Sequence, residues 1–211
     1  MQLMSSSFGH KQRIPEDYAF CVPDPAQHAC LGRNRNPHLR WTGVPSTARS
    51  LVLLGVDTDA PTRPDDVNQE GRQVPASLPR TDFYHWSMVD IPPGLHEIAA
   101  GACSDGIVAR GKSSPAGPAG SRQGINDYTG WFSGDPEMGG QYFGYDGPCP
   151  PWNDALVHHY HFVLFATDLA RCPVEGAFTG QQVRQAIDGH VLAEARLMGT
   201  YTLNPSLRQA T

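Results

Sequence analysis

An apolar run between Ser50 and Asp57 limits what this chain can fold into more than any other feature. From Leu51 to Val56 every residue is aliphatic except Gly55, and polar residues stand at both ends. A short, nearly continuous run of this kind is typical of a β-strand buried on both faces. Two more strand-length runs follow at 83–91 and 158–166. The sequence therefore predicts a mainly β protein.

The segments between these runs are rich in residues that interrupt regular structure. The chain has 22 glycines and 19 prolines among 211 residues, with prolines at 61, 64, 75 and 79 in one connection. Both residue types favour turns and loops. A chain of this length fits one domain better than two. We expect a single domain over residues 1–211 with long loops, in which residues 1–12 form a flexible arm or an edge strand.

Helical signals are confined to the C-terminal part of the chain. Thr179 and Gln182 have the spacing of a capping box, in which each side chain caps the other's backbone N–H group. Apolar residues then recur at helical spacing up to Ile187, and Gly189 ends the pattern. We expect a short helix after Thr179, a second helix over 190–197, and a short last strand from Gly199.

Charge and hydropathy argue against nucleic-acid binding and against a membrane-spanning helix. The formal net charge is -5 and the cations are scattered, whereas nucleic-acid binding requires clustered Lys and Arg. The longest apolar runs, 51–56 and 162–166, are far shorter than the roughly 18 residues of a membrane-spanning helix. Residues 1–10 lack the charged and apolar regions of a signal peptide. We therefore expect a cytoplasmic protein that does not bind nucleic acid and does not span a membrane.

The cysteine pattern indicates reduced thiols. Five cysteines occur, at 21, 30, 103, 149 and 172, without any C-x-x-C pair. Zinc-site spacing is therefore lacking. A bridge between Cys21 and Cys30 is geometrically feasible, but a cytoplasmic location disfavours it.

Polar side chains gather at the ends of the predicted strands. Asp57 and Asp59 follow the first apolar run, where alternation would place both on one side. They could orient a histidine or accept from a ligand's amine, although aspartates in turns also cap their own backbone. His158 and Tyr160 share one face of a strand, and His159 and His161 point the other way.

His85 lies in an apolar strand between aromatic residues, a setting that, taken alone, is more typical of a core histidine with a backbone partner. If His85 and His158 converge near Asp57, two chemistries compete. Imidazoles beside a carboxylate favour the protonated form and can donate hydrogen bonds to an oxyanion. Alternatively, two histidines and one carboxylate could ligate a metal. We favour the first, because the same-face neighbour of His158 is Tyr160 rather than a second histidine.

Two further enzyme signatures are missing from the sequence. No Gly-x-Ser-x-Gly elbow supplies a serine nucleophile, and the glycine-rich stretch 101–124 does not form a phosphate-binding P-loop. The proline-rich turn at 147–151 would be stiff, because proline restricts φ. It could form a fixed wall of a binding cavity or a simple tight turn between strands.

Taken together, these segments resemble the phosphatidylethanolamine-binding protein family, also called Raf-kinase-inhibitor-like, in its bacterial and archaeal branch. The motifs are Asp57-Thr58-Asp59-Ala60-Pro61, Tyr84-His85-Trp86, Gly147-Pro148-Cys149-Pro150-Pro151 and His158-His159-Tyr160. The resemblance also covers Asn126-Asp127-Tyr128, Gly189-His190-Val191-Leu192-Ala193 and Gly199-Thr200-Tyr201. It implies a β-sandwich of two antiparallel sheets with an anion pocket at one end.

Carried over by position, the residues of that pocket are Asp57, Asp59, His85, Gly147, Pro148, His158 and Tyr160. The resemblance implies binding of phosphate or a phosphorylated headgroup, and the family also contains kinase and protease inhibitors. Bacterial relatives are often homodimers. The chain departs from the family at Thr58, where proline is usual, at His159, where a basic residue is common, and in its long loops at 62–80 and 129–144.

We therefore expect a non-catalytic binding protein for a small anion or phosphorylated headgroup, without a metal or other cofactor. It could regulate a protein target, and its long loops could plug another protein's site. The alternative is a metal-dependent enzyme that uses Asp57, His85 and His158.

Overall fold

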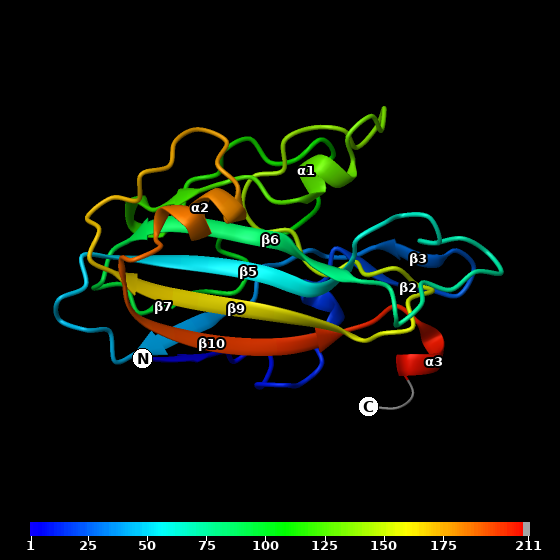
Figure 1. Cartoon of the computed structure of the whole chain (residues 1–211), viewed down its shortest axis with the longest axis horizontal. Helices are drawn as coiled ribbons and strands as arrows, with labels where there is room; N and C mark the ends of the chain where they lie inside the picture. The colour runs from blue at the N-terminus through cyan, green and yellow to red at the C-terminus, as the bar shows by residue number, and fades with distance from the viewer. Residues whose placement is uncertain (209–211) are drawn as a thin grey trace.

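The computed structural model describes residues 1–208 and is built mainly from antiparallel strands (Figure 1). Its elements, in chain order, are β1 (Gln2–Met4), η1 (Glu16–Tyr18), β2 (Cys21–Asp24), β3 (His28–Leu31), β4 (Leu39–Thr42), β5 (Ser50–Pro61), β6 (Arg80–Ile91), β7 (Glu97–Ile98), η2 (Pro118–Gly120), β8 (Arg122–Gln123), α1 (Tyr128–Trp131), β9 (His158–Thr167), α2 (Gly180–Ala186), β10 (Val191–Tyr201) and α3 (Pro205–Arg208).

The main sheet has five strands in the order β10-β9-β5-β6-β8. In Figure 1 its four long strands lie one below another, from β6 at the top to β10 at the bottom. A second sheet has the order β1-β4-β7, and β2 and β3 form a separate hairpin. All pairs within these sheets are antiparallel. The predicted fold class, two antiparallel sheets with few helices, is confirmed.

The central strand β5 is buried on both faces, as its apolar run predicts. Leu51 and Leu53 belong to a core on the inner face of the main sheet, which also contains Leu39 and Trp41 of β4. This inner core therefore joins the two sheets. Alternation turns the neighbouring residues of β5 to the outer face, where Val52 and Leu54 join a second core.

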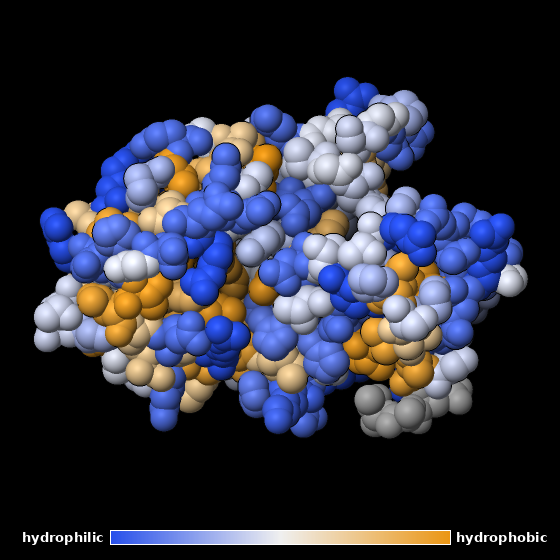
Figure 2. Space-filling view, in the orientation of Figure 1, coloured by the Kyte–Doolittle hydropathy of each residue, from blue (hydrophilic) through white to orange (hydrophobic). Residues whose placement is uncertain are grey.

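The outer core is covered by α2 and the loop that leads to it. Val183 and Ile187 pack there against Val163 and Phe165 of β9. Figure 2 shows an apolar patch over part of β5 and β9 on this face, flanked by hydrophilic residues. None of the helices within residues 1–208 has the length and apolar character needed to cross a bilayer.

The capping box at the start of α2 is present. Thr179 accepts from the backbone N–H of Gln182, whose side chain accepts from the backbone N–H of Thr179. The second predicted helix, over 190–197, is wrong. Residues 191–197 belong to β10, which pairs with β9 along nearly its whole length. Ala195 and Leu197 are buried and alternate with exposed residues, so a period of two replaces the helical period.

Candidate ligand-binding site

A cavity of about 480 Å³ opens at one end of the sandwich. Its polar lining includes four side chains that the structure buries almost completely: Asp57, His85, His158 and Tyr160. Its apolar lining includes Leu31 and Trp131, which are 58% and 49% exposed. The difference in exposure defines a polar floor, made of the four buried residues, and an apolar mouth.

Three neighbouring strands bring the floor together. Asp57 of β5 is in register with Tyr160 of β9 on one side and with Phe83 of β6 on the other. Period-two alternation then places His158 on the same face as Tyr160. The predicted shared face of His158 and Tyr160 is confirmed, and His159 and His161 lie on the opposite face, outside the cavity.

A β-bulge aims His85 into the cavity. Gly55 pairs with Trp86 while Val56 pairs with Tyr84, so His85 is an extra residue in β6. Bulges re-aim side chains and are frequent next to binding sites. His85 lines the cavity, while its neighbour Trp86 lies in the inner core. His85 and Trp86 therefore both face the inner side of the sheet, so the period-two alternation of a regular strand does not hold at this point of β6.

His158 lies between two carboxylates. Its Nδ1 is 2.7 Å from Oδ2 of Asp57, and its Nε2 is 3.1 Å from Oδ2 of Asp154. Burial lowers the pKa of His158, but the two carboxylates outweigh burial and raise the pKa to about 9. The imidazole is therefore a cation at neutral pH, and both of its N–H groups are already used.

Asp154 in turn meets a guanidinium group. Arg80 donates to both oxygens of the Asp154 carboxylate, at 2.6 and 3.0 Å. Burial would raise the pKa of Asp154, but the hydrogen bonds from His158 and Arg80 outweigh it and lower the pKa. A buried row of alternating charges thus runs from Arg80 through Asp154 and His158 to Asp57.

His85 has a different environment. Its Nδ1 lies 2.8 Å from the carbonyl oxygen of Asp146, so Nδ1 carries the proton and donates it there. Burial lowers the pKa of His85 more than Asp57 and Asp146 raise it, so the free imidazole is neutral. The nitrogen left for a ligand is Nε2. The prediction that a nearby carboxylate keeps His85 protonated is not supported for the unliganded protein.

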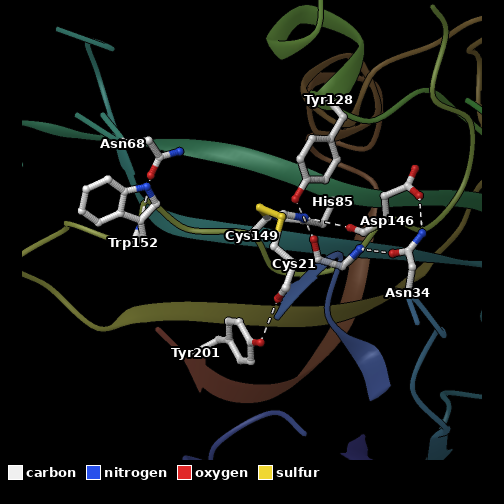
Figure 3. The surroundings of a disulfide bond; sticks show 10 residues. Cys21, Asn34, Asn68, His85, Tyr128, Asp146, Cys149, Trp152 and Tyr201 are labelled. Carbon is white, nitrogen blue, oxygen red and sulfur yellow. Dashed lines mark hydrogen bonds between the residues drawn. A yellow bond between two sulfur atoms is a disulfide. The ribbon is translucent and has the colours of Figure 1, made fainter. Parts of the chain in front are cut away.

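The carbonyl that orients His85 is itself fixed by a buried polar cluster. The Asp146 carboxylate accepts hydrogen bonds from Asn34 at 2.6 Å, Asn126 at 2.8 Å and Lys112 at 2.7 Å. Figure 3 shows Asn34 and Asp146 beside His85. Loop residues far apart in the sequence therefore hold one ring in place.

The hydroxyl of Tyr160 has no hydrogen-bond partner among the described residues, although it is buried. It lies close enough to the Asp57 carboxylate to be attracted by it, but the two groups do not meet in hydrogen-bonding geometry. Burial is the largest cause that raises the pKa of Tyr160 well above its usual value, and the charge of Asp57 is the next. The hydroxyl therefore keeps its proton. An unpartnered buried hydroxyl is costly, and here it faces a cavity that can admit a ligand.

Asp59 does not join the floor. The register between β5 and β6 shifts between Asp57 and Ala60, and the two aspartates diverge. Asp59 accepts from the backbone N–H and the ring Nδ1 of His159, both at 2.8 Å, and it is not part of the cavity lining. The predicted placement of Asp57 and Asp59 on one side is wrong, because the register shift between Asp57 and Ala60 breaks the alternation of β5.

The turn at 147–151 stands beside the cavity, but its first two residues act through their backbones. Gly147 accepts from the Tyr128 hydroxyl, and Pro148 accepts from the N–H groups of Phe20 and Cys21. A side chain on Gly147 would clash with the Tyr18 carbonyl oxygen. Of this turn, Cys149, Pro150 and Pro151 line the cavity, and Gly147 and Pro148 do not.

A disulfide joins Cys21 of β2 to Cys149 of the turn (Figure 3). The prediction of reduced thiols is therefore wrong for these two residues. A bridge from Cys21 to Cys30 is also ruled out by the hairpin register. Cys21 is opposite Leu31 while Cys30 is opposite Val22, so the two cysteine side chains point to opposite faces. Cys30, Cys103 and Cys172 are free thiols.

Both long loops form walls of the cavity. The loop at 62–80 contributes Val67 and Asn68, and the segment 128–144 contributes aromatic and apolar side chains. These loops could be singled out from the sequence, but four residues that organise the floor could not: Arg80, Tyr128, Asp146 and Asp154. Tyr128 stands out in the sequence only as part of the Asn126-Asp127-Tyr128 motif. No periodic pattern marks Arg80, Asp146 or Asp154.

The residues do not fit the alternative of a two-histidine, one-carboxylate metal centre. Both ring nitrogens of His158 are held by carboxylates, and Nδ1 of His85 donates to a carbonyl. Within residues 1–208, no group of three His, Cys, Asp or Glu side chains is placed to hold a metal ion.

Comparisons with known proteins show the family to which the chain belongs. The model of the family described as phosphatidylethanolamine-binding protein matches residues 4–202. The chain belongs to this family. A protein of Methanothermobacter thermautotrophicus named UPF0098 protein is 33% identical over 201 residues, which cover 95% of this chain and 98% of the relative.

Solved structures of bacterial relatives have a similar fold. The crystal structure of YbcL from E. coli, described as a member of the mammalian PEBP family, superposes with a TM-score of 0.68 at 25% identity. The match covers 95% of this chain and 97% of YbcL. CT736 of Chlamydia trachomatis, a putative PEBP homologue, gives a TM-score of 0.62 at 28% identity and covers 95% of each chain.

Proposed function

We propose that this protein is a non-catalytic binding protein that takes up a small phosphorylated molecule. The observation that carries the proposal is the unpartnered, buried hydroxyl of Tyr160 on the same cavity floor as Nε2 of His85. Their rings are 5.3 Å apart between centroids. One anion could therefore accept a hydrogen bond from each.

The chemistry of His85 makes binding dependent on a proton. The neutral ring offers only a lone pair at Nε2, because Nδ1 donates to Asp146. An anion at Nε2 favours the protonated ring, so the imidazole takes up a proton when the ligand binds. A hydrogen bond to a charged group contributes about 1.5–3 kcal/mol. Two such bonds support a weak to moderate affinity.

The apolar mouth favours a ligand with an organic part. Phe83, Phe132 and Met138 line the cavity together with the exposed Leu31 and Trp131. Apolar walls around a few polar groups are typical of small-molecule sites. A phosphate ester whose alcohol part is apolar, such as a lipid-type headgroup, would use both the floor and these walls.

The floor also favours binding over catalysis. The Tyr160 hydroxyl keeps its proton, His85 is not paired with a nucleophile, and the two cysteines in the lining form the disulfide. A covalent mechanism needs a nucleophile activated by a neighbouring base. Regulation of a kinase or protease and assembly into a homodimer remain predictions from the family resemblance.

The cytoplasmic location also remains a prediction, and the disulfide is an argument against it. Disulfides persist mainly in oxidising compartments. Fractionation of cells that express the protein, with thiol labelling of each fraction, would decide this point. If the protein is found in the cytoplasmic fraction and all five of its cysteines react with the thiol label after unfolding, the disulfide is contradicted.

Titration calorimetry with phosphate and with phosphorylethanolamine, in a buffer free of both, tests the proposal. We expect saturable binding to the wild type and loss of binding in His85→Ala. His159→Ala is the matched control, because His159 lies on the opposite face of the sheet and should leave the affinity unchanged. Wild-type protein that binds neither ligand, or His85→Ala with undiminished affinity, would overturn the proposal.

A further inference from the structure

We infer that Asp57 makes the site select anions that carry a proton, such as the monoanion of a phosphate monoester, over anions that carry none, such as a sulfate ester. This inference rests on the proposed function and names its ligand class more closely. It makes Asp57 a residue that determines specificity.

Asp57 is fixed as an acceptor at the floor. Its Oδ2 accepts from His158 at 2.7 Å, and its Oδ1 accepts from the backbone N–H of Asp59 at 2.8 Å. Both donors hold the carboxylate in place with its oxygens as acceptors. An ionised carboxylate can only accept hydrogen bonds, and each oxygen has a further lone pair for a ligand.

The charges behind Asp57 cancel, so they do not turn the floor into a general anion receptor. Arg80, Asp154, His158 and Asp57 alternate in sign and sum to zero. His158 and Asp57 both line the cavity, but both ring nitrogens of His158 are engaged by carboxylates. The member of the row that is left to meet a ligand is therefore the Asp57 carboxylate. The second buried ion pair near His85, between Lys112 and Asp146, is also neutral. The one positive charge gained on binding is the proton taken up by His85.

The same floor therefore presents two donors and one acceptor to a bound anion. Asp57 is the direct register partner of Tyr160 across β5 and β9, and both line the cavity. An anion that accepts from Tyr160 and His85 thus brings a further oxygen toward the carboxylate. If this oxygen carries a proton, it donates to Asp57. If it does not, two negative oxygens face each other in a buried site, which is strongly unfavourable.

Phenyl phosphate and phenyl sulfate separate the two cases. The second pKa of a phosphate monoester is about 6, so near that pH much of the phenyl phosphate is a monoanion with one P–O–H group. Phenyl sulfate has the same single charge and nearly the same shape, but no proton. Sites built around a hydrogen bond reject an analogue that lacks the group by large factors.

Calorimetry at about pH 6 would measure both ligands with the wild type, Asp57→Asn and Asp59→Asn. We expect phenyl phosphate to bind the wild type at least about 100-fold more tightly than phenyl sulfate. In Asp57→Asn the preference should fall below about tenfold, because the amide can donate to a sulfate oxygen. Asp59→Asn is the matched control and should keep the preference, since that carboxylate lies outside the cavity.

Each outcome separates the inference from the proposed function. Equal binding of both ligands by the wild type would overturn the inference and leave the proposed function intact. Binding of neither ligand would overturn both. If Asp57→Asn does not fold, the wild-type comparison alone decides. If it folds and keeps the wild-type preference, Asp57 is not the determinant and the inference fails.

Discussion

At the scale of single residues, His158 is the side chain on which the floor depends. It is 1% exposed, yet it carries a positive charge because Asp57 and Asp154 take its two N–H groups. The imidazole does not contact a ligand in our account. It holds the Asp57 carboxylate in position, and the ligand meets Asp57, Tyr160 and His85.

The charge of His158 makes stability depend on pH in one direction. The folded pKa of about 9 lies above the ordinary value of 6.5, so the contribution is complete below about 6.5 and is lost as pH rises toward 9. One pKa unit corresponds to about 1.4 kcal/mol, so the loss is on the order of 3 kcal/mol. Urea unfolding across this range should show the decrease, and ¹⁵N NMR should show both ring nitrogens protonated at neutral pH. A neutral ring at pH 7 would contradict the account.

Part of the floor could be predicted from single residues, and part could not. His158 and Tyr160 were found because alternation in a regular strand places them on one face. Asp59 was misplaced because the bulge at Asp57–Ala60 breaks that alternation. Asp146 and Asp154 carry no periodic signal, since both lie in irregular segments and act through long-range contacts.

At the scale of elements, the loop at 62–80 is held against the segment 151–155. The Asn153 amide donates to the backbone carbonyls of Asp66, Gln69 and Arg72. Arg80 at the start of β6 then reaches Asp154. The loop that walls the cavity is thus fastened to the residues that hold His158.

Arg80→Ala tests this attachment. The substitution leaves the Asp154 carboxylate buried without its guanidinium partner, so we expect a loss of roughly 3–5 kcal/mol in the free energy of unfolding. Arg72→Ala is the control on the same loop. Its ion pair with Asp66 is largely exposed, and removal should change stability by less than about 1 kcal/mol. Equal effects of the two variants in denaturant unfolding would show that the buried row of charges has no special role.

The last long strand shows how local propensity misleads at this scale. Residues 191–198 are rich in Ala, Leu, Glu and Arg, which favour helices. The strand forms because β9 offers a full edge for pairing, and because Ala195, Leu197 and Tyr201 can then face the inner core. Tertiary pairing overrides the propensity of this segment.

At the scale of the whole molecule, the disulfide connects parts of the chain that are 128 residues apart. It ties β2 to the turn at 147–151, next to the cavity. Closing so long a loop restricts the unfolded chain, and native disulfides typically contribute about 2–4 kcal/mol. Because the sequence shows neither the pairing nor the spatial approach of the turn, only the folded structure identifies Cys149 as the partner.

Cys149→Ala should therefore lower the free energy of unfolding by about 2–4 kcal/mol, and a reducing agent should lower the stability of the wild type by a similar amount. Cys30→Ser is the matched control, because Cys30 is a free, exposed thiol on the neighbouring strand. A wild type whose unfolding curve does not respond to reduction would show that the bond contributes nothing.

The family and the sheet architecture were predictable because several motifs occur in the expected order and the apolar runs have strand length. The detail of the site was less predictable, because it depends on two bulges and on loop contacts. His85 illustrates both parts. Its motif was recognised, but its neutral state follows from burial and from the Asp146 carbonyl.

The central claim is that an anion meets Nε2 of His85 on the cavity floor. The most direct test is ¹⁵N-detected NMR of the histidine rings at neutral pH during a titration with inorganic phosphate. We predict that the Nε2 signal of His85 moves saturably toward the protonated form, while the ring signals of His159 stay unchanged. A His85 ring that remains neutral and unmoved at saturating phosphate would contradict the account.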